Sequence, residues 1–231
     1  MRVSDALNYE YPRPAVAVDL VVCTVADSKL QVLLIRRGQE PFVERLALPG
    51  GFVRVHEGGV GGESVDEAAA RELEEETGLL RGTVALEVVG VYGAPDRDPR
   101  ARVISIAYLA LVAPEQVRSI RAGSDAAAAA WIPVSELVEI LAFDHSSILR
   151  DCINQLQHRI DLGPMALHLM PKFFTVDELR RAFEAVKGQP YNPGNFRRKF
   201  AGLVSDGWIV PTADLRLTAT KPSRLYRFHK A

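Results

Sequence analysis

One stretch of this 231-residue chain decides its fold: Glu63, seven further residues, and then Arg71-Glu72-Leu73-Glu74-Glu75-Glu76-Thr77-Gly78-Leu79. Alanine and glutamate dominate Glu63–Thr77 and favour a helix there, which Gly78 is suited to end. At about 100° per residue, Glu72, Glu75 and Glu76 share one face of that helix. Because close carboxylates repel one another unless a cation lies among them, we expect these three to bind Mg²⁺ or Mn²⁺. Such an ion can activate water, so the same three residues are the expected catalytic groups of any hydrolysis.

A solvated, glutamate-rich helix face is the alternative explanation of these carboxylates. The full spacing favours a binding site instead, because eight positions from Glu63 to Leu79 resemble the core of the Nudix box. That pattern is a glycine, five residues, a glutamate, seven residues, and then Arg-Glu-aliphatic-any-Glu-Glu-any-Gly-aliphatic. Upstream, the sequence Pro49-Gly50-Gly51-Phe52-Val53 also resembles the usual start of this motif.

The chain departs from the Nudix pattern at one place. Eleven residues separate Gly51 from Glu63 where the family has five, and Glu57 stands where the family has glycine. The extra residues fall in the glycine-rich stretch His56–Gly62, which predicts a longer loop before the helix. Since a misplacement of about 1 Å can slow catalysis on the order of 100-fold, we expect the insertion to weaken hydrolysis more than ligand binding.

Strand-rich sequence surrounds the acidic helix. Runs of β-branched and other apolar residues predict strands at Ala15–Val25, Leu30–Arg37, Thr83–Tyr92, Arg102–Val112 and Ala126–Val134, with short apolar pieces within Leu46–Val55. We expect helices at Ser135–Ala142 and Ser146–Ile160. Strands grouped around few helices predict an α+β fold, and the resemblance implies the Nudix α/β/α sandwich with a mixed sheet.

Two further segments resemble Nudix proteins of the ADP-ribose type: Asp96-Arg97-Asp98-Pro99-Arg100 and Ala142-Phe143-Asp144-His145. Arginine is a forked donor suited to phosphate, although ordinary loop or strand-end charges are an equally simple explanation of these arginines. We expect His145 to be a structural hydrogen-bond partner. The expected ligand-binding residues are Gly50, Gly51, Phe52, Arg36, Arg97 and Arg100.

Charge is distributed unevenly along the chain. The formal net charge is −1, but residues 1–164 carry 16 basic and 24 acidic side chains, whereas residues 165–231 carry 12 and 5. The net charges of the two segments are therefore −8 and +7. A basic segment joined to an acidic body is typical of a module that binds nucleic acid, although small domains also vary in charge by chance.

The basic segment has the pattern of a winged helix. A capping box at Thr175 precedes one helix, and Asn192-Pro193 begins a second, which Asp206-Gly207 ends. Two strands, Leu215–Thr218 and Leu225–His229, follow. In this layout the second helix enters the major groove of DNA and the hairpin reaches a neighbouring groove or the backbone. A solvated face on a dimerisation domain is the alternative. The expected DNA-binding residues are Asn195, Arg197, Arg198, Lys199, Lys221 and Arg224.

Together, the two segments resemble the Nudix-related transcriptional regulators of NAD metabolism. Besides the Nudix string, the resemblance rests on Asn195-Phe196-Arg197-Arg198-Lys199 and on Lys221-Pro222-Ser223-Arg224-Leu225-Tyr226-Arg227-Phe228, where Lys221 replaces the usual arginine. It implies a Nudix-like ADP-ribose-binding domain at residues 1–155 and a winged helix-turn-helix domain at residues 156–231. It also implies a homodimeric repressor of NAD biosynthesis or salvage genes, bound to double-stranded operator DNA and released by ADP-ribose.

The alternative function is enzymatic. The protein would then be a Mg²⁺-dependent ADP-ribose diphosphatase whose basic domain serves only dimerisation, and the retained carboxylates leave this open. In a repressor the metal could be dispensable for DNA binding. In either case a ligand-driven change needs a mechanical link, and we expect Ser146–Ile160, a helical stretch at the charge boundary, to be the lever.

Composition excludes several other classes of protein. Apolar residues make up 48% and charged residues 25%, the ordinary globular mixture. No run approaches the 20 or so apolar residues of a membrane span, and no secretory signal opens the sequence. Cys23 and Cys152 are too few for a disulfide framework and are expected in the core. We therefore expect a cytoplasmic protein with no membrane partner.

Overall fold

The computed structural model describes residues 12–56, 61–79, 82–117, 126–217 and 222–229. Lys221, one of the expected DNA-binding residues, lies outside these ranges. Within them, no helix is both long and apolar enough to span a membrane.

A mixed sheet forms the first part of the molecule, in the order β3-β2-β1-β6-β5, with β4 paired to β1 and β7 paired to β2. The β1–β2 hairpin is the expected one, and β1 and β6 run parallel while the other pairs are antiparallel. The strands are β1 (Ala15–Ala26), β2 (Lys29–Arg37), β3 (Leu46–Ala47), β4 (Gly50–Phe52), β5 (Leu86–Tyr92), β6 (Val103–Leu111) and β7 (Ala126–Pro133).

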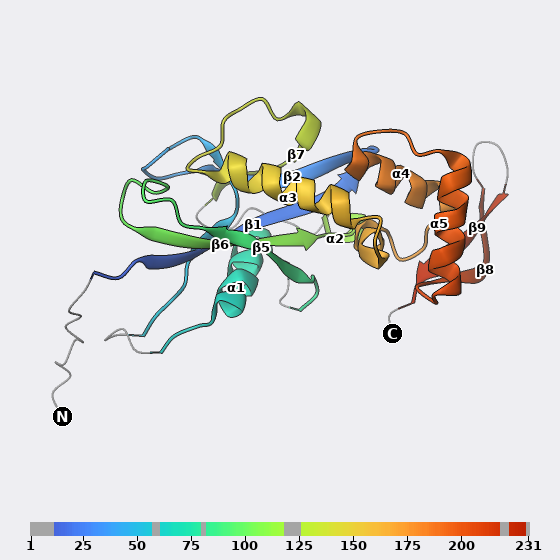
Figure 1. The fold of residues 1–231 in the computed structure, drawn as a ribbon, viewed down its shortest axis with the longest axis horizontal. Helices are drawn as coiled ribbons and strands as arrows, with labels where there is room; N and C mark the ends of the chain where they lie inside the picture. The colour runs from blue at the N-terminus through green and yellow to red at the C-terminus, as the bar shows by residue number, and fades with distance from the viewer. Residues whose placement is uncertain (1–11, 57–60, 80–81, 118–125, 218–221, 230–231) are drawn as a thin grey trace.

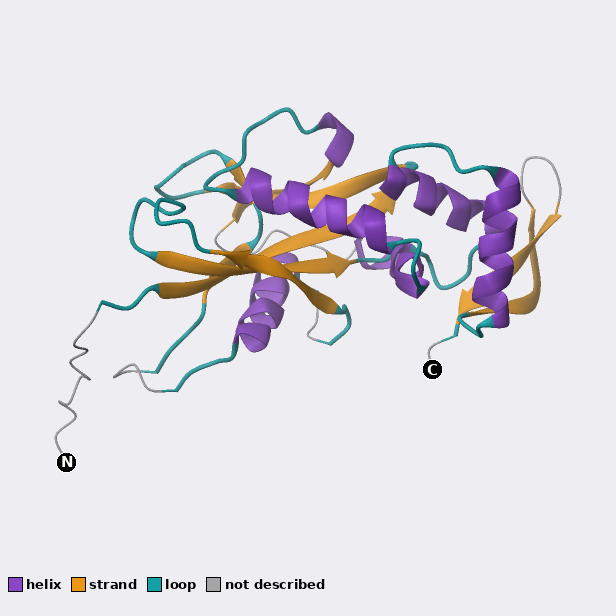
Figure 2. Cartoon of the chain, viewed as in Figure 1, coloured by secondary structure: helices purple, strands orange, loops and turns teal. Residues whose placement is uncertain are grey.

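Helices cover both faces of this sheet (Figures 1 and 2). Alternate residues of a strand point to opposite faces, so Leu20 and Val22 pack under α1 (Val65–Thr77), whereas Val21 and Cys23 pack under α3 (His145–Arg159). The expected α/β/α sandwich with a mixed sheet is confirmed. A single short turn, α2 (Pro114–Val117), follows β6.

The ends of α1 follow from its sequence. Ser64 accepts a hydrogen bond from the backbone N–H of Glu67, whose side chain in turn accepts one from the N–H of Ser64. At the other end Gly78 adopts φ 73°, a left-handed conformation that glycine reaches without strain. The expected start at Glu63 is therefore two residues early, because Ser64 is the cap.

The basic segment folds as a winged helix. Its helices are α4 (Val176–Lys187) and α5 (Pro193–Ser205), and its hairpin is β8 (Ile209–Leu217) with β9 (Pro222–Phe228). The capping box at Thr175 and the Asn192 cap are both present. Strand β8 begins six residues earlier than expected because Ile209, fully buried, pairs with Phe228.

The expected helix at Ser135–Ala142 is wrong. A short 3₁₀ turn, η1 (Val134–Glu136), is followed by irregular chain, and Val138 and Ile140 point into solvent. Leu141 and Ala142 are buried instead, and the N–H of Ala142 donates to the carbonyl of Leu46 at 2.8 Å. Tertiary packing against the β2–β3 region thus overrides the local helix propensity of a short segment.

One hydrophobic cluster joins the Nudix sheet to the winged helix. The cluster contains the α3 face of the sheet, α3, the turn η2 (Pro164–Leu169), α4 and α5, and α4 packs directly against β1 and β2. The expected domain boundary between residues 155 and 156 falls within α3, and we retain it as a proposal.

Candidate ligand cleft and DNA-binding surface

A cleft of 540 Å³ opens between α1 and the ends of β2 and β4. One of its walls is acidic and the other is basic. The basic wall suits the phosphates of a ligand, and the acidic wall suits a cation bound beside them. The lining residues are Ile35, Arg36, Arg37, Gly38, Gln39, Gly50, Gly51, Phe52, Arg54, Glu72, Glu75, Glu76 and Arg100. The three expected metal ligands and five of the six expected ligand-binding residues therefore lie together.

The two glycines of β4 leave room for different neighbours, the β1 backbone at Gly50 and the Glu72 side chain of α1 at Gly51. Gly50 has φ 155°, and a Cβ there would collide with the carbonyl oxygen of Val18. A Cβ on Gly51 would collide with the carboxylate of Glu72. A larger residue at position 50 would therefore collide with the backbone of β1, and one at position 51 would force the Glu72 carboxylate to move.

Arg71 organises the acidic wall. Its buried guanidinium donates to Glu63 at 2.6 Å, to Glu72 at 2.6 Å and to Glu75 at 2.8 Å, and also to the carbonyl of Phe52 at 3.1 Å. These bonds lower the pKa of Glu63 to about 2, whereas burial raises the pKa of Glu72. One buried cation therefore holds three carboxylates in position.

Hydrogen bonds close the base of the longer loop between Gly51 and Glu63. Val55 and Gly62 form an antiparallel bridge, and beneath it the N–H of Glu63 donates to the carbonyl of Arg54 at 3.0 Å. The N–H of Arg54 donates back to the Glu63 carboxylate at 2.8 Å. The insertion is thus closed at its base, and Glu63 keeps its bond to Arg71.

The acidic wall has the right atoms for a divalent ion but holds arginine instead. The guanidinium of Arg54 donates to Glu75 at 3.0 and 3.2 Å, beside the bond from Arg71. In the described part of the chain, no three His, Cys, Asp or Glu side chains are gathered closely enough to hold a metal. Carboxylate oxygens suit Mg²⁺ or Mn²⁺, so an ion at Glu72 and Glu75 would have to displace Arg54. Arg54 was not among the expected site residues, although its place two residues after Phe52 was a signal.

Aromatic rings hold the basic wall. Arg100 lies 5.4 Å from the ring of Phe52 and 5.5 Å from that of Phe143, and Arg37 lies 4.7 Å from Phe143. Arg36 donates to the carbonyl of Glu44 at 2.6 Å. Each guanidinium is also bonded within the protein: Arg100 donates to both oxygens of Asp98 at 3.0 and 2.7 Å, and Arg37 donates to the carbonyl of Pro41 at 2.8 Å. Stacking and these bonds restrict the side chains along this wall before any ligand binds. Arg37 and Phe143 were not among the expected ligand-binding residues.

Arg97 lies beneath the cleft and not at its surface. Its buried guanidinium donates to Asp144 at 2.7 and 2.9 Å and to Asp19 at 3.0 Å. Asp19 also accepts from Ser105 at 2.6 Å, and its other oxygen lies 3.2 Å from His145 Nε2. These bonds tie β1 to the beginning of α3, a structural role in place of the expected contact with ligand.

His145 completes this network. The N–H of Leu48 donates to His145 Nδ1 at 2.9 Å, so the ring proton lies on Nε2 and faces Asp19. The expected structural role of His145 is therefore the one the geometry supports. Because Leu48 precedes Pro49-Gly50-Gly51 in sequence, the network connects the cleft floor to α3.

Protonation of Asp19 at low pH should remove the stabilisation that its bonds to Arg97, Ser105 and His145 give the folded protein. Burial alone would raise the pKa of Asp19. The opposing effects of His145, of the hydrogen bond from Ser105 and of the Arg97 charge are larger together, and they lower the pKa to about 2. The folded pKa lies below the unfolded value, so the stabilisation is complete above pH 4 or so and disappears as the pH falls towards 2. We expect the difference in unfolding free energy between wild type and Asp19→Asn to shrink by about 2 kcal/mol between pH 5 and pH 2 in urea titrations. A difference independent of pH would contradict the ionised network.

The expected DNA-binding residues divide into two groups. Asn195, Arg197 and Arg198 on α5 and Arg224 on β9 are exposed, and Arg198 donates to the side chain of Asn195 at 2.6 Å. Lys199 is half-buried and turned towards Asp161. The exposed group lies on α5 and the hairpin, away from the cleft (Figure 1).

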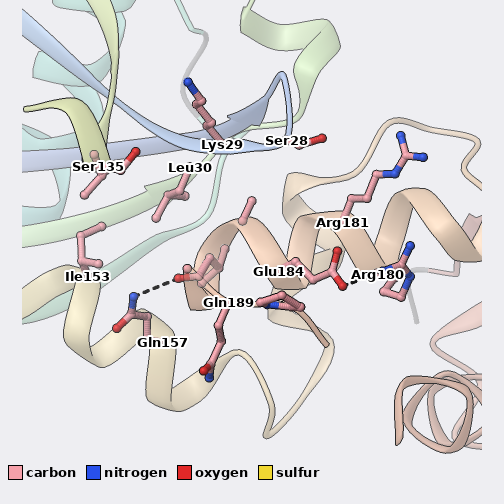
Figure 3. Close-up of a pocket in the computed structure, with 15 residues that line it drawn as sticks. Ser28, Lys29, Leu30, Ser135, Ile153, Gln157, Arg180, Arg181, Glu184 and Gln189 are labelled. Atoms are coloured by element: carbon pink, nitrogen blue, oxygen red, sulfur yellow. Dashed lines mark hydrogen bonds and ion pairs between the residues drawn. The ribbon is translucent and has the colours of Figure 1, made fainter. Parts of the chain in front are cut away.

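A second cavity, of 710 Å³, lies between the β1–β2 turn and α4 (Figure 3). Charged side chains that line the cavity form ion pairs: Lys29 with Glu136 on one side, and Arg180 with Glu184 on the other. At its base Gln157 of α3 donates to the carbonyl of Val186 at 3.0 Å. The cavity therefore marks the joint between the two parts, with these charges already paired.

This fold and site define a class of protein: a Nudix domain joined through the helix α3 to a winged-helix DNA-binding domain. The NUDIX domain family model matches residues 14–153, and the model of the NrtR DNA-binding winged helix domain matches residues 166–228. The chain therefore belongs to the NrtR family of Nudix-related regulators.

Similar proteins agree with this assignment. The chain is 30% identical over 220 residues to the ADPR responsive transcriptional repressor NtrR of Acinetobacter baylyi, covering 95% of this chain and 84% of that protein. The crystal structure of Shewanella oneidensis NrtR complexed with a 27mer DNA matches with a TM-score of 0.76 and 26% identity over 93% of each chain. An ADP-ribose pyrophosphatase of Methanocaldococcus jannaschii is 43% identical over 141 residues, 61% of this chain and 74% of that protein.

Proposed function

We propose that this protein is an ADP-ribose-responsive transcriptional repressor of NAD biosynthesis or salvage genes. It binds double-stranded operator DNA as a homodimer, and ADP-ribose in the Nudix cleft releases it. The observation that carries the proposal is the position of α3, which begins at the Asp144–His145 network beneath the cleft and ends against the winged helix.

The cleft suits a nucleoside diphosphate sugar. Arg36, Arg37 and Arg100 line one wall and bring positive charge for a diphosphate, while Phe52, 44% exposed, offers a ring beside them. The remaining N–H donors of these arginines would bind the phosphates, since Arg100 is already bonded to Asp98 and Arg36 to the carbonyl of Glu44. The homologous repressor of Acinetobacter baylyi is described as ADPR responsive, which supports this choice of ligand.

The exposed side chains of α5 and β9 suit DNA. Asn195 and Arg198 have the chemistry to read adenine and guanine edges, while Arg197 and Arg224 can neutralise phosphates. Two copies are needed to span two half-sites about 34 Å apart, which is why we propose a homodimer. We place the protein in the cytoplasm, where operator DNA and ADP-ribose are both accessible.

A second function, ADP-ribose hydrolysis, is favoured by one observation. The three Nudix carboxylates are present on α1, and Glu63, where the inserted loop closes, is bonded to Arg71. Nudix relatives imply dependence on a divalent metal. We propose Mg²⁺ or Mn²⁺ at Glu72, Glu75 and Glu76, where it would supply charge for the diphosphate; DNA binding does not require it.

The test measures DNA binding and hydrolysis in the same samples. A labelled duplex is first selected by the wild-type protein from a random pool, and its anisotropy is followed as ADP-ribose is added. We expect ADP-ribose to raise the Kd for this duplex by about 5- to 150-fold, the usual size of allosteric coupling. Release of AMP is assayed with Mg²⁺ in wild type and Glu75→Gln. Unchanged DNA binding together with turnover that Glu75→Gln abolishes would establish the enzyme instead.

A further inference from the structure

Asp161, two residues beyond α3, is bonded to three side chains of the winged helix. Its carboxylate accepts from Lys187 at 2.5 Å, from Tyr191 at 3.1 Å, and lies 3.2 Å from the amine of Lys199. Its backbone carbonyl also accepts from Lys199, at 2.7 Å. One residue at the end of the lever helix thus holds the end of α4, the α4–α5 connection and the middle of α5.

The amine of Lys199 is turned towards the protein in this arrangement and not towards solvent. Its amine has the carboxylate and carbonyl of Asp161 as partners and lies 5.2 Å from the ring of Phe183. The side chain is 17% exposed, whereas the neighbouring Arg197 and Arg198 are exposed. The basic triplet on α5 therefore divides into two residues that face solvent and one that faces the protein.

Asp161 is held in its ionised form, and a second polar contact lies close to it. Burial raises the pKa of its carboxyl, but hydrogen bonds from Lys187 and Lys199 lower it to a net value below the usual range. One turn earlier, Gln157 donates to the carbonyl of Val186 at the end of α4 (Figure 3). This bond lies at the base of the 710 Å³ cavity, which both residues line. The polar attachment of the winged helix is thus concentrated at the end of α3.

We propose that Asp161 is a positioning residue that sets the recognition helix α5 on the lever helix, and that Lys199 serves this contact and not a DNA phosphate. The inference rests on the proposed DNA-binding function. Since base-reading side chains must be held within about 0.5 Å of their productive position, a clamp on the middle of α5 controls affinity without touching DNA.

The salt dependence of DNA binding tests this inference. Each phosphate contact contributes about 0.9 to the slope of log K against log salt, because binding releases condensed counterions. We expect Arg197→Met to lower the slope by about one unit for each phosphate that it no longer neutralises, whereas Lys199→Met weakens binding about 3- to 10-fold at an unchanged slope. Asp161→Asn should weaken binding to the same extent. The double variant should be no worse than either single one, because both remove the same interaction.

The measurements use the full chain and the duplex that the wild type selects from a random pool. Circular dichroism confirms that each variant is folded, and Lys199→Arg, which keeps the donors, should restore most of the affinity. A slope that falls in Lys199→Met as it does in Arg197→Met would overturn the inference and return Lys199 to the DNA interface. Unchanged DNA affinity in Asp161→Asn would also overturn it. If the wild type selects no duplex, the proposed function fails first, and the inference fails with it.

Discussion

Replacing Arg97 by methionine is expected to destabilise the folded protein by about 3–5 kcal/mol, the usual cost of removing one partner from a buried ionic network. The guanidinium of Arg97 lies between Asp19 and Asp144, and both Asp19 and Arg97 are buried. Without it, Asp19 keeps Ser105 and His145 as partners but is deprived of the permanent positive charge that offsets its burial. Methionine fills similar volume, so the expected destabilisation arises from charge and hydrogen bonding and not from a cavity.

Urea titration at pH 7 measures this destabilisation directly, with Arg102→Met as the matched control. Arg102 is exposed and donates to the carbonyl of Ala94, so its replacement should change the unfolding free energy by less than about 0.5 kcal/mol. A decrease below about 1 kcal/mol in Arg97→Met, with weakened binding of ADP-ribose, would mean instead that Arg97 turns into the cleft and contacts ligand.

Local signals made most elements of this fold predictable. The capping residues Ser64, Thr175 and Asn192, together with Gly78 and Gly188, mark helix ends through bonds made within a few residues. The strands follow from their apolar runs, since both faces of the sheet are covered. The prediction of a helix at Ser135–Ala142 was wrong because that segment is not governed by local signals. Its conformation follows from a contact with Leu46, which is far away in sequence.

The candidate site was predictable where a motif places its residues and not where distant segments meet. The carboxylates of α1 and the glycines of β4 lie in the cleft as the Nudix spacing suggests. The burial of Arg97 depends on Asp19, 78 positions away, and the orientation of Lys199 depends on Asp161, 38 positions away. An arginine or lysine in sequence looks the same whether its charge will meet a phosphate or a buried carboxylate.

These long-range pairs also change how the charge asymmetry is understood. The sequence suggested that a cation and a diphosphate offset the acidic helix, yet Arg54 and Arg71 already neutralise part of it. In the basic segment, Lys187 and Lys199 are paired with Asp161, which lies outside the residues whose net charge is +7. The charge available to DNA is therefore carried by fewer residues than the net charge suggests, chiefly those exposed on α5 and the hairpin.

Arg198 is the exposed residue of α5 whose replacement should weaken DNA recognition most. Its guanidinium is held by the side chain of Asn195 at 2.6 Å, an arrangement that presents both residues on one face of the helix. An arginine that pairs with a guanine edge contributes about 1–3 kcal/mol, so Arg198→Ala should weaken binding to the selected duplex by roughly 5- to 150-fold for each recognition helix.

The comparison between two duplexes identifies the cause of that weakening. On a scrambled duplex of equal length we expect Arg198→Ala to bind nearly as well as the wild type, because a base contact contributes little there. Arg181→Ala is the matched control, since Arg181 is an exposed arginine of α4 bonded to Asp177 and should leave both affinities within about twofold. Equal decreases in affinity on the two duplexes would show that Arg198 binds phosphate, and base recognition would then have to come from Asn195 or from the hairpin residue Arg224.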